Sequence, residues 1–444
     1  MSNLEITLAT LQQWADDPSL IEDNARAKTL IAKIHREGSR YAKKEARDGR
    51  RARDRAKVEL TGRVLNSTAQ RPVLLSPATA TKDSRDSELE QERSCPACRA
   101  RFSRLHHFYH AYCPACAEFN WQKRHQSADL SGRIALVTGG RIKIGFECAL
   151  KLLRCGAQVV VTTRFAADAH ARYARQSDFE VWRERLHVVA LDLKFLGEVE
   201  RFGAHLDATL PHLDILVNNA AQTVARPPQF YASLLQGELA HAKALTTSEP
   251  IPGQIEAGRA MTLDVFFPPN RFDLDGQQVD LRPVNSWTQQ LGEVDALEAA
   301  QCYVVGALAP FVLTGQLRPL LKRSPHARRF VVQASAMEGN FSRISKTTRH
   351  PHTNMTKAAL NMLVRTSAAD LKEDGIWCNA VDTGWITDEN PQPLAERLRT
   401  EGFIPPLDSI DGAARLLSPV FEGLNKDDEP LWGHFLKDYV PHEW

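Results

Sequence analysis

Four cysteines in the chain have the spacing of a metal site. They form two Cys-Pro-Ala-Cys tetrapeptides, which are separated by 14 residues. Each Cys-x-x-Cys turn presents two thiolates to one ion, and four thiolates complete a closed tetrahedral shell. We therefore predict a structural zinc site made of Cys95, Cys98, Cys113 and Cys116. A redox pair or an iron site is the alternative interpretation of the same spacing.

A second group of residues could hold a phosphate. The segment TGGRIKIG starts at Thr138, directly after a short β-branched run. A glycine-bearing turn between a strand and a helix offers backbone N–H groups and a helix N-terminus to a pyrophosphate. Arg141 and Lys143 stand in the turn itself, and Arg164 follows the next β-branched run. These cations suit a phosphate ligand; the alternative is a solvated basic rim.

The composition is that of a globular protein. The 444 residues are 43% hydrophobic and 25% charged, which excludes a chain that is disordered throughout. The start, MSNLEITLATLQQW, has no basic segment followed by an apolar core, and the later apolar stretch CYVVGALAPFVLTG is too short to span a bilayer. We expect a cytoplasmic protein without a membrane segment. Eight cysteines are too few for a disulfide scaffold in a chain of this length.

The pattern along the chain divides it into four parts. Residues 1–60 have helical spacing, residues 61–94 have linker composition, and residues 95–120 contain the cysteine pairs. Residues 130–444 alternate short β-branched runs with longer helical runs, and this alternation pauses over residues 222–300. The alternation predicts an α/β fold with a doubly wound parallel sheet and one long insertion.

Several features of this last part occur in the order of a known family. Thr138, Gly139 and Gly145 match the turn TGxxxGxG, Asn218 begins NNAA after the fourth strand, and Lys357 opens a later helix. In these features the chain resembles the short-chain dehydrogenase/reductase family over residues 130–440. The resemblance implies a Rossmann-type domain that binds NAD(H) or NADP(H) and moves hydride between the nicotinamide and a carbonyl or alcohol.

The resemblance also assigns roles in cofactor binding. Lys143 takes the place of the middle glycine of the turn. Thr163 stands where members that use NAD carry an acid, and Arg164 next to it resembles the arginine that meets the 2′-phosphate in members that use NADP. We therefore expect NADP(H) in preference to NAD(H).

Three further positions follow from the resemblance. Asp192 corresponds to the acid that contacts the adenine amino group, and Asn218 to the asparagine that ties the fourth strand to its neighbours. After the sixth strand the family's Pro-Gly step, which cups the nicotinamide carboxamide, reads Thr383-Gly384. The expected nicotinamide pocket is therefore more altered than the adenosine half.

The family's catalytic tetrad consists of lysine, tyrosine, serine and asparagine, and here only Lys357 is kept. Gly306 takes the place of the asparagine, Ala336 that of the serine with Ser335 one residue early, and Thr353 that of the tyrosine. An alkanol hydroxyl has a pKa far above that of a phenol, and its short side chain reaches less far. Thr353 therefore cannot replace the tyrosine as proton donor.

A histidine is one candidate for a replacement acid. His350 stands seven residues before Lys357, where the enoyl reductase branch of the family places its tyrosine. An imidazole can donate a proton near neutral pH. The alternative is that His350 is a surface loop histidine beside Pro351.

Two functions remain open from the sequence. One is an NADP(H)-dependent oxidoreductase with a rearranged proton donor, acting on a small molecule that the sequence does not specify. The other is a catalytically inactive, cofactor-sensing or scaffold protein that acts through the zinc module and the arm. Residues 33–57 of the arm hold eleven Lys or Arg against four acids, so an RNA or protein partner is possible, with a solvated helix as the alternative. A homo-oligomer is also possible.

Overall fold

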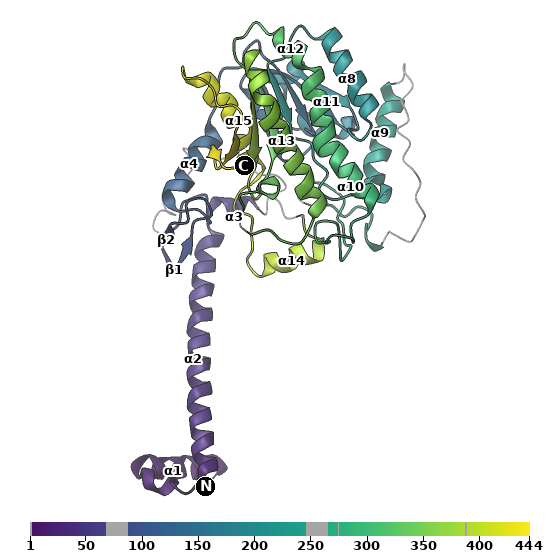
Figure 1. The fold of residues 1–444 in the computed structure, drawn as a ribbon. Coiled ribbons are helices and arrows are strands. Elements are labelled where there is room, and N and C mark those ends of the chain that lie inside the picture. Colours follow the sequence, from purple (N-terminus) through teal and green to yellow (C-terminus); the bar gives the residue numbers. More distant parts are fainter. Residues whose placement is uncertain (1, 68–87, 246–264, 274, 344, 387–388) are drawn as a thin grey trace.

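The structure is a computed structural model that describes residues 2–67, 88–245, 265–273, 275–343, 345–386 and 389–444. Figure 1 shows three parts: an α/β domain, a small module beside it, and a long helix that projects away from both. The predicted α/β fold with a doubly wound, mostly parallel sheet is confirmed.

Eight strands form the central sheet. Its spatial order is β10-β9-β8-β7-β6-β3-β4-β5, with all neighbours parallel except the β9–β10 hairpin. The strands are β3 (Ile134–Thr138), β4 (Gln158–Thr163), β5 (Leu186–Ala190), β6 (Ile215–Asn218), β7 (Arg329–Ser335), β8 (Ile376–Asp382), β9 (Phe435–Lys437) and β10 (Val440–His442). The strand order reverses beside β3, and the crevice at such a reversal is where ligands bind in open α/β sheets.

Helices cover both faces of the sheet. On one face lie α5 (Lys143–Arg154) and α15 (Ser409–Asn425), and on the other lie α8 (Leu196–Thr209), α11 (Ala309–Gln316) and α13 (Pro351–Glu373). The sequence of α13 explains its burial: Leu360, Val364, Ala368 and Leu371 repeat every three or four residues and form one apolar face.

Shorter helices connect these layers. They are α6 (Ala166–Ala174), α7 (Phe179–Trp182), η4 (Arg183–Arg185), η5 (Pro228–Tyr231), α9 (Ala232–Leu245), α10 (Ala296–Tyr303), η7 (Val304–Leu308), α12 (Arg318–Lys322), η8 (Met337–Gly339) and α14 (Gln392–Thr400). The predicted insertion thus contains η5 and α9, while residues 246–264 lie outside the described part of the chain. The helix α9 packs against α6.

One continuous helical stretch is unusually apolar. Among the described residues, Ala296–Gln316 is the stretch with the length and composition of a membrane span, with a mean hydropathy of 1.6. It packs against α8 and α13 as a core helix does, and 39% of its most apolar window is buried. Length and composition alone are weak evidence of a membrane span.

The module that carries the cysteines begins earlier than the sequence predicts. Its elements are β1 (Glu88–Ser94), β2 (Arg101–Arg104) and α4 (Pro114–His125), and α3 (Gly62–Asn66) packs beside them. Within the predicted linker, 61–94, residues 62–66 are therefore helical and residues 88–94 form a strand. The polar strand Glu88–Ser94 reads as linker because its pairing partner and its apolar neighbours come from elsewhere in the chain.

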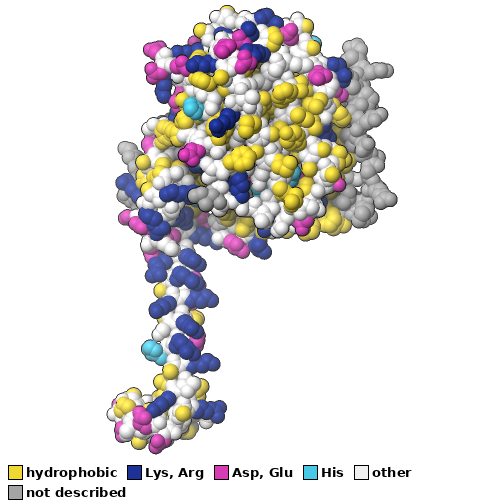
Figure 2. All heavy atoms as spheres, in the orientation of Figure 1, with side chains coloured by type: hydrophobic (Ala, Val, Ile, Leu, Met, Phe, Trp, Pro, Cys, Tyr) yellow, Lys and Arg dark blue, Asp and Glu magenta, His cyan; other side chains and the backbone are white. Residues whose placement is uncertain are grey.

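The arm consists of α1 (Asn3–Asp16), the short helix η1 (Pro18–Ile21) and the 35-residue α2 (Ala25–Glu59). Only Asp54 and Val58 of α2 are buried. The carboxylate of Asp54 accepts hydrogen bonds from the backbone N–H groups of Glu90 and Gln91, at 2.7 and 3.0 Å. This contact fixes the end of α2 to β1. Figure 2 shows many Lys and Arg side chains on the surface along the rest of the helix.

Candidate functional site

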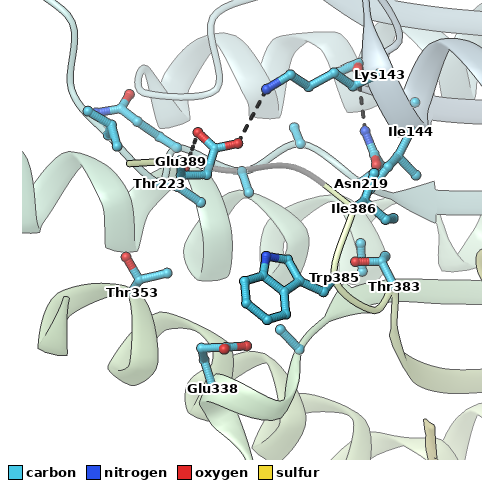
Figure 3. Close-up of a pocket in the computed structure, with 18 of the residues that line it drawn as sticks. Lys143, Ile144, Asn219, Thr223, Glu338, Thr353, Thr383, Trp385, Ile386 and Glu389 are labelled. Carbon is cyan, nitrogen blue, oxygen red and sulfur yellow. Dashed lines mark hydrogen bonds and ion pairs between the residues drawn. The ribbon is translucent and has the colours of Figure 1, made fainter. Parts of the chain in front are cut away.

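A cavity of about 1390 Å³ opens at the carboxyl ends of the parallel strands. It is continuous from the glycine turn after β3, past Arg164 and Asp192, to Lys357 on α13. Residues far apart in the sequence thus line one space, because the ends of parallel strands meet at one edge of the sheet. Figure 3 shows side chains from several of these elements around it.

The turn after β3 has the close packing that requires glycine. Gly139 has a φ of +71°, and a Cβ there would lie 3.0 Å from Ala220. A Cβ on Gly145 would lie 2.3 Å from the carbonyl oxygen of Gly139. The hydroxyl of Thr138 accepts hydrogen bonds from the backbone N–H groups of Asn219 and Ala220, at 3.0 and 3.1 Å. The turn therefore forms the exposed backbone cradle that a pyrophosphate needs.

Lys143 departs from this pattern, and its backbone conformation is unfavourable. It begins α5 with a φ of +54°, a left-handed conformation that a side chain disfavours. Its Nζ lies 3.3 Å from Oε1 of Glu389, as Figure 3 shows. Burial lowers the pKa of Lys143, but the carboxylates of Glu389, Asp275 and Asp273 outweigh it and leave the pKa above its ordinary value. The ammonium is thus charged and extends across the cavity toward an acid.

The two arginines near the turn have different surroundings. Arg141 is buried and donates to Oδ2 of Asp168 at 2.8 Å, so its charge is already paired. Arg164 is exposed, with its guanidinium 4.7 Å from the centre of the Tyr231 ring and donating to the Tyr231 hydroxyl at 3.0 Å. Arg164 is therefore the more available of the two for an anionic ligand.

Asp192 and Asn218 lie at the ends of β5 and β6. Asp192 lines the cavity beside Lys194, whose Nζ is 3.5 Å from it. Asn218 is buried outside the cavity and donates to the hydroxyl of Thr314 on α11 at 3.3 Å. The following Asn219 lines the cavity and donates to the carbonyl oxygens of Thr138 and Gly139 at 3.0 and 3.3 Å. Asn219 thus holds the turn in shape, a role that we did not predict.

Lys357 is buried at the inner end of the cavity. Its Nζ donates to the carbonyl oxygen of Ala334 on β7 at 2.6 Å. Burial lowers the pKa of Lys357 to about 8, even though Cys302, Glu338 and Asp382 favour its charged form. Gly339 allows this close approach of η8, because a Cβ there would lie 2.4 Å from the backbone of Lys357.

The positions expected to replace the tetrad lie around Lys357. Thr353 lines the cavity one helical turn before the lysine, and its hydroxyl hydrogen bonds with Nε2 of His352 at 3.3 Å. Ser335 lines the cavity as well, but its hydroxyl is buried and donates to Oδ1 of Asn361 at 2.5 Å. Both hydroxyls are engaged within the protein.

His350 lies outside the set of residues that line the cavity. Its ring stacks on Trp287, with the ring centres 4.0 Å apart and the planes 4° from parallel. Burial lowers the pKa of His350, which disfavours the protonated form that would donate a proton. The structure therefore does not favour His350 as a proton donor into the cavity. The alternative of a surface loop histidine is also wrong, because His350 is buried and is the N-cap residue of α13.

Gly306, the position expected to replace the asparagine, packs closely against α13. It lies in η7, a π-helical segment where the α10–α11 stretch passes α13. A Cβ at this position would lie 2.4 Å from Cγ2 of Thr356. A larger side chain there therefore requires at least the Thr356 side chain to move.

Glu338, Asp382 and Trp385 also line the cavity, and the sequence did not single them out. Asp382 ends β8 and is buried, which raises the pKa of its carboxyl group. Glu338 lies 3.3 Å from Arg343. Figure 3 shows Thr383 and the Trp385 indole on the loop that follows β8, and Glu338 on a different segment. Asp382 directly precedes the Thr383-Gly384 step. An acid next to this expected part of the nicotinamide pocket could have been recognised in the sequence as a candidate site residue. Gly384 has a φ of +80° and packs against Leu407 and Arg415.

The four cysteines of the module converge. Their Sγ atoms all lie within 4.8 Å of one another, and those of Cys98 and Cys113 are 3.6 Å apart. None of the described cysteines forms a disulfide. Four thiols gathered from two turns form a donor set that fits one tetrahedral ion.

The first cysteine turn also forms part of the cavity wall. Pro96, Ala97 and Arg99, which surround Cys98, line the cavity together with Tyr112. The module shares one apolar cluster with Ile386, which follows β8, and with Ile144 of the glycine turn. The cysteine module and the crevice of the sheet are therefore parts of one site.

Comparison with known proteins relates one part of the chain to a family. The sequence model described as short chain dehydrogenase matches residues 133–234. An uncharacterized protein of Acanthamoeba polyphaga mimivirus is 30% identical over 347 residues, which are 74% of this chain and 71% of that protein. Dehydrogenase/reductase SDR family member 13 of Bos taurus is 40% identical over 95 residues, 21% of this chain and 24% of that protein.

Solved structures resemble the same region. A short chain dehydrogenase from Burkholderia cenocepacia in complex with NADP has a TM-score of 0.46 and 20% identity, covering 69% of this chain and 96% of that one. The family match includes the glycine turn, Arg164, Asp192 and Asn219, which line the cavity. This part of the chain, residues 133–234, is therefore similar to the short-chain dehydrogenase/reductase family.

Proposed function

We propose that the chain binds a nicotinamide dinucleotide, NADP(H) in preference to NAD(H), and is an oxidoreductase whose proton donor differs from the tyrosine of its family. The observation that carries this proposal is the single cavity that joins the glycine turn and Arg164 to Lys357. The donor set fits the cofactor: backbone N–H groups and Lys143 for the pyrophosphate, Asp192 for the adenine, and Lys357 for the nicotinamide ribose. The bound cofactor supplies the hydride.

The exposed guanidinium of Arg164 supports the preference for NADP(H). Arg164 lines the cavity, and its guanidinium contacts the rings of Phe165 and Tyr231 and the Tyr231 hydroxyl. A phosphate monoester would give it a charge-assisted partner, which a ribose hydroxyl cannot match.

Proton transfer must use groups other than the family's. The hydroxyls of Thr353 and Ser335 are committed to His352 and Asn361. The imidazole of His350 stacks on Trp287 and does not itself line the cavity. Glu338 and Asp382 line the cavity and act electrostatically on Lys357. These two carboxyl groups are available for general acid–base chemistry, and the raised pKa of Asp382 favours its protonated, donating form.

A second candidate function is that of a cofactor-sensing or scaffold protein without turnover. It is favoured by the loss of three tetrad positions, Gly306, Ala336 and Thr353, and by the position of the cysteine turn against the cavity. In that case the zinc module, which lies against the cavity, would signal to a partner whether the cofactor is bound. We propose that this module binds one structural Zn²⁺ through Cys95, Cys98, Cys113 and Cys116.

The basic arm supports a partner of opposite charge. Arg40, Lys43, Lys44, Arg47 and Arg50 line a shallow hollow on α2. Clustered Lys and Arg bind phosphate-rich polymers such as RNA mainly through charge. An RNA or an acidic protein partner and a homo-oligomeric state remain proposals for this chain.

The deciding experiment has two stages. Fluorescence titration with NADPH and NADH measures binding, and we expect NADPH to bind more tightly. A screen of aldehydes, ketones and enones for NADPH oxidation then separates the two candidates. Saturable binding with turnover supports the oxidoreductase, saturable binding without turnover supports the sensor, and a lack of binding would refute both.

A further inference from the structure

A second cluster of ligating groups lies at the opposite edge of the sheet from the cavity. His212 and Asp214 precede β6, His326 lies in the turn before β7, and Gly132 lies before β3. These three strands are neighbours in the sheet, so three separate loops meet at this point. We propose that His212, Asp214 and His326, with the carbonyl oxygen of Gly132, bind one divalent transition-metal ion.

The distances between the donor atoms support a metal site. Nε2 of His212 lies 3.2 Å from Oδ2 of Asp214 and 3.4 Å from the carbonyl oxygen of Gly132. Nε2 of His326 lies 3.5 Å from the same carbonyl oxygen, and the three side-chain donors lie within 4.8 Å of one another. Tetrahedral bonds of about 2.0–2.1 Å place neighbouring ligands about 3.3–3.4 Å apart. The contacts therefore already have nearly the spacing of metal ligands.

Neighbouring groups hold the carboxylate of Asp214 in position. Asp214 is fully buried, its Oδ2 accepts from the backbone N–H of Ile134 at 2.7 Å, and its Oδ1 accepts from the hydroxyl of Ser324 at 2.6 Å. The Ser324 hydroxyl also accepts from the backbone N–H of His326 at 3.1 Å. Hydrogen bonds of this kind orient ligands around bound metals.

The local backbone directs the fourth donor. Gly132 has a φ of +75°, which a residue with a side chain rarely adopts. This turn points its carbonyl oxygen toward both imidazoles, since each Nε2 contacts it. Two imidazole nitrogens that converge on one oxygen from separate loops are better explained by a shared ion than by two separate contacts.

The donor set determines the class of ion. Imidazole nitrogen with carboxylate oxygen suits Zn²⁺, Ni²⁺, Co²⁺ or Cu²⁺ better than Mg²⁺ or Ca²⁺. Arg133 lies 3.5 Å from Oδ1 of Asp214, the oxygen that faces Ser324, and its positive charge weakens but does not block binding at Oδ2. Both histidines are half-buried, so an ion can enter from solvent. A bound ion would tie together the starts of three strands.

Equilibrium dialysis of the untagged, full-length protein against Ni²⁺ tests the proposal, with zinc measured in the same samples by mass spectrometry. We expect one Ni²⁺ per chain to bind without displacing zinc. His212→Ala and His326→Ala should each weaken binding by more than about tenfold. His205→Ala, an exposed histidine on α8, is the matched control and should leave binding unchanged.

A second variant guards against loss of folding. His326→Asn keeps a side-chain N–H for the carbonyl of Gly132 but removes the imidazole, so it should fold and still lose Ni²⁺ binding. Ni²⁺ should also raise the melting temperature of the unaltered protein and of His205→Ala, but not of His326→Asn. The absence of saturable Ni²⁺ binding, or its persistence in both His326 variants, would show that the cluster is only hydrogen-bonded.

Discussion

Arg124 and Asp408, which are 284 positions apart in the sequence, form a buried bidentate salt bridge. The two terminal guanidinium nitrogens donate to the two carboxylate oxygens at 2.6 and 2.9 Å. Arg124 lies on α4 of the cysteine module and Asp408 caps α15 of the α/β domain. Arg124 also donates to Asp411, which accepts the hydroxyl of Tyr109. The two parts of the protein are therefore joined by a buried charge cluster.

Replacing Arg124 with Met should destabilise the protein by about 3–5 kcal/mol, since it leaves two buried carboxylates without their cation. Chemical denaturation measures this free energy of unfolding. Arg101→Met is the control, because Arg101 pairs with Glu92 on the surface and should cost less than about 1 kcal/mol. Equal costs for the two variants would show that the module does not depend on this contact.

Purified protein should contain about one zinc per chain in the cysteine site, as measured by elemental analysis of protein prepared without chelator. Cys95→Ser combined with Cys98→Ser should abolish it, because two thiolates cannot complete a tetrahedral shell. Cys155→Ser, outside the cluster, is the control. Unchanged zinc in the double variant would rule out these ligands.

Arg164→Ala should lower the affinity for NADPH by about one to two decades and leave that for NADH almost unchanged. A hydrogen bond between charged groups contributes about 1.5–3 kcal/mol, and NADH lacks the phosphate. Fluorescence titration compares the two cofactors, with Arg175→Ala as control, because Arg175 is exposed and does not line the cavity. If the unaltered protein bound both cofactors equally, the assignment of Arg164 would fail.

Lys357 should give the protein a pH-dependent stability. Its pKa is about 8 in the folded protein against 10.5 as its ordinary value. Between these values the unfolded chain holds the proton that the folded chain has released, so stability rises with pH from about 8 to 10.5. Lys357→Met lacks this gain, so its stability relative to the unaltered protein should fall by up to about 3 kcal/mol over that window. Denaturation at pH 7.5 and 10 tests it, and a constant difference would contradict the lowered pKa.

Ordinary aldehydes and ketones should be reduced slowly or not at all, even when NADPH binds. General acid–base catalysis typically contributes about 10²–10⁴-fold, and the phenol that supplies it in the family is absent. His350→Ala and Thr353→Ala should each leave cofactor affinity and this low rate nearly unchanged. A fast native reaction that collapses in His350→Ala alone would identify the imidazole as the proton donor.

The sequence predicts the sheet well because local patterns encode it. The β-branched runs and the glycine turn are each readable within a dozen residues. The helix that carries Lys357 is also predicted, although it begins at Pro351, six residues before the lysine. The structure brings the predicted residues Gly139, Arg164 and Lys357 to one cavity, as the order of the strands requires.

Contacts between distant segments could not be predicted in this way. Lys143 forms an ion pair with Glu389, which is 246 residues away in the sequence. No sequence pattern around either residue predicts this pair. The same holds for Pro96 and Arg99, which the sequence assigns to a separate module and the structure places in the wall of the cavity. The identities of the neighbours across a packed interface depend on the whole fold.

The length of α2 has a consequence for what the arm can do. A helix of 35 residues extends about 52 Å at 1.5 Å per residue, and it touches the body of the protein only near its end. The arm is thus a rigid spacer that holds α1 several nanometres from the cavity. A partner bound at α1 would contact the protein far from the cavity, so its binding and cofactor binding can be tested separately.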